Sequence, residues 1–230
     1  MATENPQIES NEIAEFVEKY INQTDQSIFL TGKAGTGKTT LLHKIVKETY
    51  KQTVIVAPTG IAALNAGGVT IHSFFQLPFG GFIPDFNFNA EALSYVKLET
   101  KSTLMRHFKM NASRKAIIRN MELLIIDEVS MLRADLLDAM DWTLRNVRQT
   151  NKPFGGVQVL FIGDLLQLPP VAKNEEWQYL SKYYNGIFFF HAHVIKEKPL
   201  VYIELEKVYR QENTDFIAIL NNLRNNTITQ

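Results

Sequence analysis

The chain has 230 residues, 45% of them hydrophobic, with 24 basic residues against 24 acidic ones and no cysteine. This composition excludes a disordered tail, disulfides and thiolate metal sites, and the neutral balance confines any nucleic-acid affinity to local patches. The polar N-terminus does not resemble a secretion signal, and no apolar run approaches the ~18 residues of a membrane span. We therefore expect a cytoplasmic protein built around one large α/β domain.

The first expected element is a helix within an N-terminal helical segment, residues 1–26. Ser10 can cap this helix, and a polar turn at residues 22–25 can end it. Its apolar positions recur at helical spacing: Ile13, Phe16, Val17, Tyr20 and Ile21. We expect this face to pack beside the ligand pocket of the main domain, residues 27–230.

A phosphate-binding loop stands between a short apolar strand, residues 27–31, and the helix that follows it. Residues 32–39 match the pattern G-x-x-x-x-G-K-[ST] at every fixed position. Backbone N–H groups would face phosphate oxygens, with Lys38 placed for the β and γ phosphates and the Thr39 hydroxyl for Mg2+. Lys33 occupies a variable position, which favours a solvated side chain. The residues assigned to the nucleotide are Gly32, Lys33, Ala34, Gly35, Thr36, Gly37, Lys38, Thr39 and Thr40.

Strand and helix patterns alternate after this loop. A buried strand at residues 53–57 and a short helix at residues 61–65 favour a parallel, doubly wound sheet with ligands at the carboxyl ends of its strands. An irregular insertion is expected at about residues 76–112, and its aromatic content suits an ordered, functional loop. Residues 97–119 carry seven basic residues against one acidic residue. This basic stretch could follow a phosphate backbone or form a solvated helix face.

Acidic and amide side chains follow two later strands. Residues 123–126 are apolar and run into Asp127 and Glu128, on a strand that we expect beside the phosphate loop. Asp127 would hold the magnesium ion, and Glu128 would orient and activate a water molecule. A further strand precedes Asp164 and Gln167, where the neutral amide can sense the γ-phosphate. Asp164 is equally explained as a helix cap.

The second half of the chain contains five more expected elements. They are a helix at residues 134–147, strands at residues 157–162, 187–190 and 200–203, and a last helix at residues 215–223. His191 and His193 would alternate on one of these strands. Because no acidic or sulfur partner accompanies them, we assign them no metal site.

Six motifs occur in a fixed order: the phosphate loop, residues 57–63 (APTGIAA), 70–74 (TIHSF), 126–131 (IDEVSM), 163–170 (GDLLQLPP) and 208–211 (VYRQ). In this order the chain resembles the Pif-type DNA helicases, relatives of RecD in helicase superfamily one, over about residues 27–224. The resemblance implies a RecA-like first motor domain that moves 5′ to 3′ on single-stranded DNA with ATP and magnesium. It also implies a monomer that acts on forked or structured DNA in repair and telomere maintenance, and that is nucleoid-associated if bacterial.

The resemblance assigns roles to individual residues. Lys38, Asp127, Glu128 and Gln167 serve the nucleotide, and Arg210 reaches the γ-phosphate with its planar guanidinium. The DNA side is assigned to Pro58, Thr59, Gly60, Thr70, His72, Phe74 and Phe75. Hydroxyls and backbone N–H groups suit phosphates, whereas aromatic faces suit bases. The two phenylalanines can equally be core residues, and the histidine a buried imidazole.

Two departures from the family pattern affect these expectations. Glu12 stands where family members often carry a glutamine that reads adenine, with Gln7 a little upstream. Nothing up to Gln230 resembles a second RecA-like domain, and stepping along DNA needs two lobes that close around ATP. Two other functions therefore stay open: a stand-alone P-loop ATPase, and a non-catalytic nucleic-acid-binding remnant of a helicase.

Overall fold

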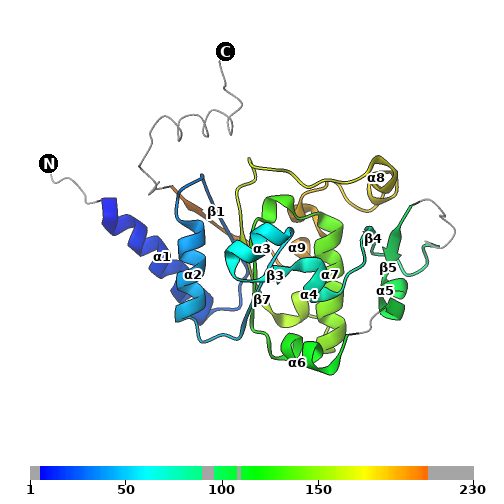
Figure 1. The fold of residues 1–230 in the computed structure, drawn as a ribbon, viewed down its shortest axis with the longest axis horizontal. Helices are drawn as coiled ribbons and strands as arrows, with labels where there is room; N and C mark the ends of the chain where they lie inside the picture. The colour runs from blue at the N-terminus through cyan, green and yellow to red at the C-terminus, as the bar shows by residue number, and fades with distance from the viewer. Residues whose placement is uncertain (1–5, 90–95, 108–109, 207–230) are drawn as a thin grey trace, which may run out of the picture.

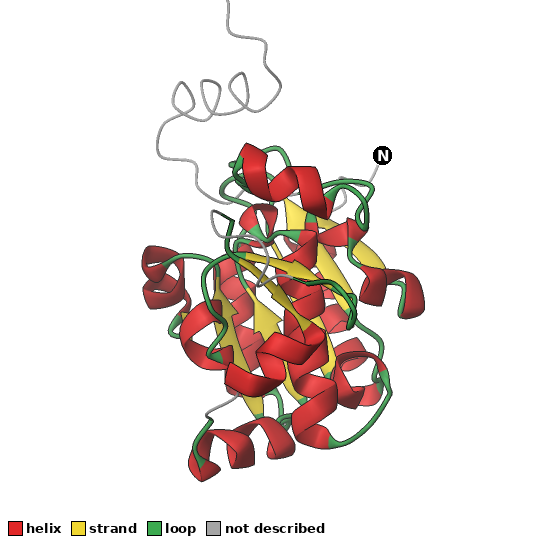
Figure 2. Cartoon of the chain, turned by 90° about the vertical axis from the view of Figure 1, so that its right-hand side faces the viewer, coloured by secondary structure: helices red, strands yellow, loops and turns green. Residues whose placement is uncertain are grey.

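A six-stranded parallel sheet forms the centre of the computed structural model, which describes residues 6–89, 96–107 and 110–206. The strands lie in the order β3-β2-β6-β7-β1-β8. Their bounds are Val69–Thr70 (β3), Thr53–Ala57 (β2), Leu123–Ile126 (β6), Gln158–Ile162 (β7), Ile28–Gly32 (β1) and Val201–Leu205 (β8). Helices cover both faces of this sheet (Figure 1, Figure 2), which confirms the predicted α/β, doubly wound parallel arrangement.

Helices of very different length surround the sheet. The α-helices are α1 (Pro6–Gln23), α2 (Lys38–Glu48), α3 (Gly60–Ala66), α4 (Ile71–Phe75), α5 (Lys101–His107), α6 (Ala112–Asn120), α7 (Ala134–Arg148), α8 (Asn174–Leu180) and α9 (His193–Glu197), and the 3-10 helices are η2 (Val129–Met131), η3 (Pro153–Gly156) and η4 (Phe189–His191). α1 and α2 lie side by side on one face, whereas α4, α7 and α9 lie on the other (Figure 1). Within the described ranges, no helix has the length and apolarity needed to cross a bilayer.

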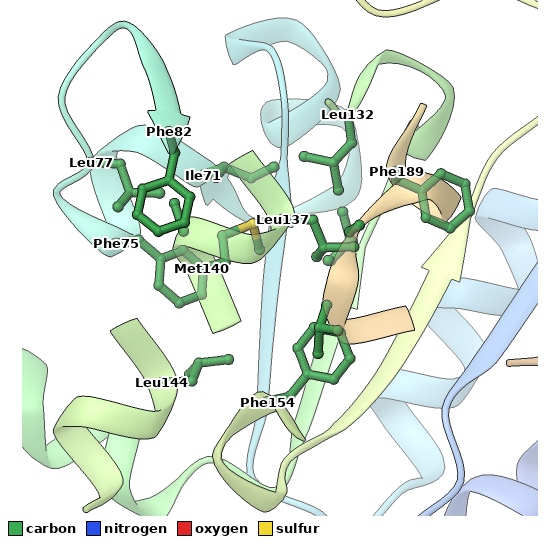
Figure 3. Packing of buried hydrophobic residues seen from close by; sticks show 14 of the residues in the cluster. Ile71, Phe75, Leu77, Phe82, Leu132, Leu137, Met140, Leu144, Phe154 and Phe189 are labelled. Carbon is green, nitrogen blue, oxygen red and sulfur yellow. The ribbon is translucent and has the colours of Figure 1, made fainter. Parts of the chain in front are cut away.

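The central strands bury side chains on both faces. In β6, Leu123 and Ile125 join the apolar layer under α1 and α2, while Leu124 and Ile126 join the layer under α7. Figure 3 shows this second layer, where side chains from α4, α7 and strand β4 (Gly81–Ile83) pack together. Burial on both faces explains why these strands are continuous apolar runs in the sequence.

The N-terminal helix differs from its prediction in two ways. It begins at Pro6, so Ser10 lies inside the helix and does not cap it. Phe16 is 51% exposed and its ring contacts the Tyr20 ring in a tilted arrangement with centroids 5.6 Å apart, whereas Val17 is fully buried. The buried stripe of this helix is therefore narrower than its apolar residues suggested.

The strand predicted at residues 187–190 is wrong. Phe188 makes only an isolated antiparallel bridge with Arg133, and the chain then turns into η4. Phe189 is fully buried, with its ring stacked on Phe161 at a centroid distance of 5.2 Å. Tertiary packing of this aromatic residue thus overrides the strand preference of an aromatic run. His191 and His193 consequently do not share a strand.

The insertion contains more regular structure than predicted. β4 pairs in parallel with β5 (Leu98–Thr100), and α5 follows directly. The Phe82 N–H donates to the buried Asp135 carboxylate at 2.9 Å, and Arg133 bridges Asp135 to Glu176 of α8. These short elements were missed because three-residue strands carry too little periodicity to be recognised.

Several basic residues of the 97–119 stretch contact the protein itself. Arg114 donates to the carbonyls of Ser73 and Phe74 at the end of α4. The Arg119 Nε donates to the Val147 carbonyl at 3.2 Å, and the Lys101 ammonium lies 5.1 Å from the centre of a tryptophan ring. These residues consolidate the fold, so the stretch is not one continuous track for a phosphate backbone.

The buried carboxyl group of Asp141 should make the free energy of unfolding depend on pH. The carboxylate accepts hydrogen bonds from Arg145 and from the Phe154 N–H, and burial raises its pKa to about 6 despite these contacts. Because the folded pKa lies above the unfolded value, the stabilising proton is bound at low pH and is lost as the pH rises through 6. We expect unfolding at pH 5 to cost about 1 kcal/mol more than at pH 7 through this group.

Urea unfolding of the wild type and of Asp141→Asn at both pH values measures this difference. The variant should lose the contribution of Asp141, about 1 kcal/mol, from the gain at pH 5, while the exposed control Glu175→Gln should keep it. An unchanged pH dependence in Asp141→Asn would contradict the assignment.

Candidate nucleotide and nucleic-acid site

The candidate site lies along the edge where the parallel strands end. Because all paired strands of the sheet are parallel, the segments after β1, β7 and β6 come together at this edge, and those after β2 and β3 lie beside them. β7 lies between β1 and β6. The sequence analysis expected the strand before Asp127 and Glu128 to lie beside the strand of the phosphate loop. This expectation is wrong, because β7 separates β6 from β1. The immediate neighbours of β1 are β7, which leads to Gln167, and β8.

The phosphate loop has a backbone that only glycine adopts easily. Gly37 has a φ of 85° at the start of α2, and a side chain on Gly32 would place its Cβ 2.6 Å from the Leu205 carbonyl oxygen. The buried Thr36 hydroxyl donates to the Lys33 carbonyl at 2.9 Å and braces the loop. In the described part of the chain no side chain caps α2. Its first N–H groups can therefore serve an anion.

Lys38 turns back into the loop. Its Nζ donates to the Gly32 carbonyl at 2.6 Å and to the Lys33 carbonyl at 3.0 Å. A phosphate that enters the loop would meet this ammonium at the centre of the curl, so Lys38 is positioned as its main positive charge. Lys33, Ala34, Thr39 and Thr40 are exposed, which agrees with a loop open to a ligand.

Asp127 and Glu128 form a half-buried acidic pair. Burial raises the pKa of Asp127, while the Glu128 N–H bond and the charges of Lys38 and His43 oppose the rise. Burial and the neighbouring Asp127 raise the pKa of Glu128, Lys38 opposes this rise, and Asp164 adds to it. Because these charges shift each other's pKa values, Lys38, the two acids after β6 and Asp164 after β7 belong to one electrostatic site. A carboxylate with a raised pKa suits proton abstraction near neutral pH.

Asp164 connects the amide to this acidic pair. It is 2% exposed, and its Oδ1 accepts the Leu166 N–H at 3.1 Å, which is a local turn and not a helix cap. Its Oδ2 lies 3.5 Å from the Gln167 Nε2. Asp164 thus orients Gln167 and also adds negative charge near Glu128. The sequence left its role open because the contact with Gln167 depends on the shape of the loop.

The residues assigned to DNA divide into exposed and buried groups. Thr59 and Thr70 cap α3 and α4, where their hydroxyl oxygens accept the N–H groups of Ala62 at 3.2 Å and Ser73 at 3.3 Å. Each hydroxyl keeps its own proton for another acceptor, and a phosphate is one such acceptor. Gly60 is exposed, and Pro58 and His72 are half-buried.

Phe74 and Phe75 do not offer a stacking face. Their exposed fractions are 7% and 0%, and the two rings contact each other edge to face at 4.9 Å within the core. Both residues therefore belong to the core, and their predicted role as DNA contacts is wrong. Phe79, which the sequence analysis did not select, is 78% exposed and stacks on His72. The following pair of glycines is the only sequence feature that could have drawn attention to it.

The oxygen groups at the site fit a magnesium ion. Thr39 and Asp127 could provide hard oxygen ligands, because Mg2+ is commonly held by one or two protein groups together with phosphates and water. In the described part of the chain no three histidine, aspartate or glutamate residues cluster as a separate metal site. The predicted Arg210 and the helix predicted at residues 215–223 lie outside the described residues.

Comparison with known proteins identifies a family. The model of the PIF1-like helicases matches residues 7–230. The chain is 38% identical over 210 residues to the ATP-dependent DNA helicase PIF1 of Saccharomyces cerevisiae and 38% identical over 200 residues to that of Homo sapiens. These matches cover 88% and 86% of the chain but only 21% and 27% of the relatives' own length.

Solved structures agree with this result. A Bacteroides Pif1 bound to ssDNA is 44% identical, with a TM-score of 0.81 over 95% of this chain and 46% of the other. A Bacteroides Pif1 in complex with ADP-AlF3 and ssDNA is 43% identical, with a TM-score of 0.80 over 100% of this chain and 47% of the other. The fold is thus that of the RecA-like domain in these structures, and the chain spans about half of their length.

Proposed function

Since the chain belongs to the PIF1-like helicase family, we propose that it is the ATP-binding motor domain of an ATP-dependent DNA helicase. The observation that supports this most is the convergence of Lys38, the Asp127–Glu128 pair and the Asp164–Gln167 pair at one edge of the sheet. These groups are what a nucleoside triphosphatase needs around a γ-phosphate.

Each group has a defined task in this proposal. Lys38 neutralises the β and γ phosphates, and Thr39 with Asp127 would hold Mg2+, which supplies charge stabilisation at those phosphates when it is bound. Glu128 accepts the proton of the attacking water. Gln167 senses the γ-phosphate from the loop that Asp164 orients, and Arg210 would add a guanidinium to the same phosphate.

DNA binding belongs to the segments after β2 and β3. The capping hydroxyls of Thr59 and Thr70 and the exposed backbone of Gly60 would contact a phosphate backbone, and their position beside the nucleotide segments at the same edge of the sheet supports this role. We propose single-stranded and forked DNA as the substrate, with movement from 5′ to 3′ by a monomer. Unwinding would require a second RecA-like domain, in line with relatives about twice as long as this chain.

Isothermal titration of the 230-residue chain with a non-hydrolysable ATP analogue and oligodeoxythymidylate tests this function. We expect both ligands to bind, and each to change the affinity for the other at least about 5-fold. A stand-alone ATPase would bind the nucleotide without coupling to DNA, and a non-catalytic remnant would bind DNA alone. Either result would contradict the motor proposal.

A further inference from the structure

One face of the Phe79 ring is exposed to solvent, and the other face stacks on the His72 ring. Phe79 is 78% exposed, and its ring lies on the half-buried His72 ring at a centroid distance of 4.7 Å and an interplanar angle of 21°. Leaving a phenylalanine ring this exposed gives up most of the stabilisation that burial would bring. Among the exposed hydrophobic residues, Phe79 is set apart by its stacked contact with His72, which makes the pair a candidate contact surface for a ligand.

The chain around Phe79 holds the ring in place. Leu77 and Phe82 on either side point into the core (Figure 3). The Gly81 N–H donates to the Lys97 carbonyl at 3.1 Å, and a Cβ on Gly80 would lie 2.5 Å from the same oxygen. Because the backbone is tied at these points, the exposed ring is a fixed platform that loses little conformational freedom when a ligand stacks on it.

The surroundings of the platform suit a nucleotide. Lys97, whose backbone lies against the glycines, has an exposed side chain. His72 lies on α4, two residues after Thr70, which caps this helix and whose hydroxyl is a proposed phosphate contact. Burial and the charge of Arg133 lower the pKa of His72, so its imidazole is neutral near pH 7 and supports the phenyl ring as an uncharged aromatic surface.

We propose that Phe79, supported by His72, is a stacking platform for one base of single-stranded nucleic acid, and that Lys97 neutralises an adjacent phosphate. This inference rests on the proposed function and adds a base contact that the helicase motifs do not include. An aromatic face accepts every base, so the platform contributes affinity without sequence preference. Lys97 contributes about one ion to the salt dependence of the affinity.

Fluorescence anisotropy with labelled oligodeoxythymidylate tests the platform. Phe79→Ala should weaken binding about 5- to 100-fold, whereas Phe79→Tyr should restore it. Tyr50→Ala is the matched control, because Tyr50 is also 78% exposed but lies after α2, away from this platform. Both alanine variants should bind the ATP analogue as the wild type does. Lys97→Gln should reduce the dependence of affinity on salt by about one ion.

An abasic strand separates stacking from an indirect effect. On such a strand the wild type and Phe79→Ala should bind equally, because no base remains to stack. Equal binding of these two proteins to the base-bearing strand, or a loss in Phe79→Ala that persists on the abasic strand, would overturn the platform while leaving DNA binding intact. If the wild type itself bound no DNA, the proposed function would fail together with this inference.

Discussion

Lys38→Ala is expected to weaken ATP binding by at least about 100-fold and to remove hydrolysis. The ammonium lies inside the curl of the loop, held by the carbonyls of Gly32 and Lys33, and no other described cation occupies that position. When a triphosphate enters, these carbonyl contacts are exchanged for phosphate oxygens. The alanine variant offers only neutral N–H groups to a strongly charged ligand, and this difference is measured by titration with a fluorescent ATP analogue.

Lys33→Ala is the control for this loss. Lys33 belongs to the same loop and is exposed, so its removal should change ATP affinity by no more than about 3-fold. The two variants remove the same charge from positions five residues apart. If both weakened binding equally, the effect would come from the general field of the loop and not from a specific contact of Lys38.

Glu128→Gln is expected to slow hydrolysis by about 100- to 10,000-fold with little loss of ATP affinity. The amide cannot accept the proton of the attacking water, whereas the phosphate contacts of the loop remain. Single-turnover hydrolysis and nucleotide titration on the same samples measure the two effects separately. A parallel loss of both would mean that Glu128 acts on binding and not on the proton.

The backbone of Glu128 adds a prediction about stability. Glu128 has φ 51° and ψ 44°, a left-handed conformation that costs a non-glycine residue about 1–2 kcal/mol and that asparagine adopts more readily. Glu128→Asn and Glu128→Gln both remove the half-buried charge, but only asparagine also relieves the backbone. We expect Glu128→Asn to be the more stable of the two by up to about 1 kcal/mol in urea unfolding. Equal stability of the two variants would show that the backbone stores no strain there.

Local patterns account for most of the sheet and the nucleotide loop. The match at residues 32–39 depends on glycines and a lysine at fixed separations, and strands buried on both faces appear in the sequence as apolar runs. For this reason β2 and β6 have the bounds that were predicted, and the α/β class was correct. The acids after β6 were found because parallel strands bring their carboxyl ends to one edge.

Tertiary structure decided the features that depend on contacts between distant segments. The position of β7 between β1 and β6, the burial of Phe74 and Phe75, and the use of Arg114 to cap α4 all follow from packing of residues far apart in the chain. A sequence pattern reports the chemical type and spacing of side chains. It does not report which side chains another segment of the chain will cover. In this fold, other segments cover Phe74 and Phe75, which are core residues, whereas none of the described segments covers Phe79, which is exposed to solvent.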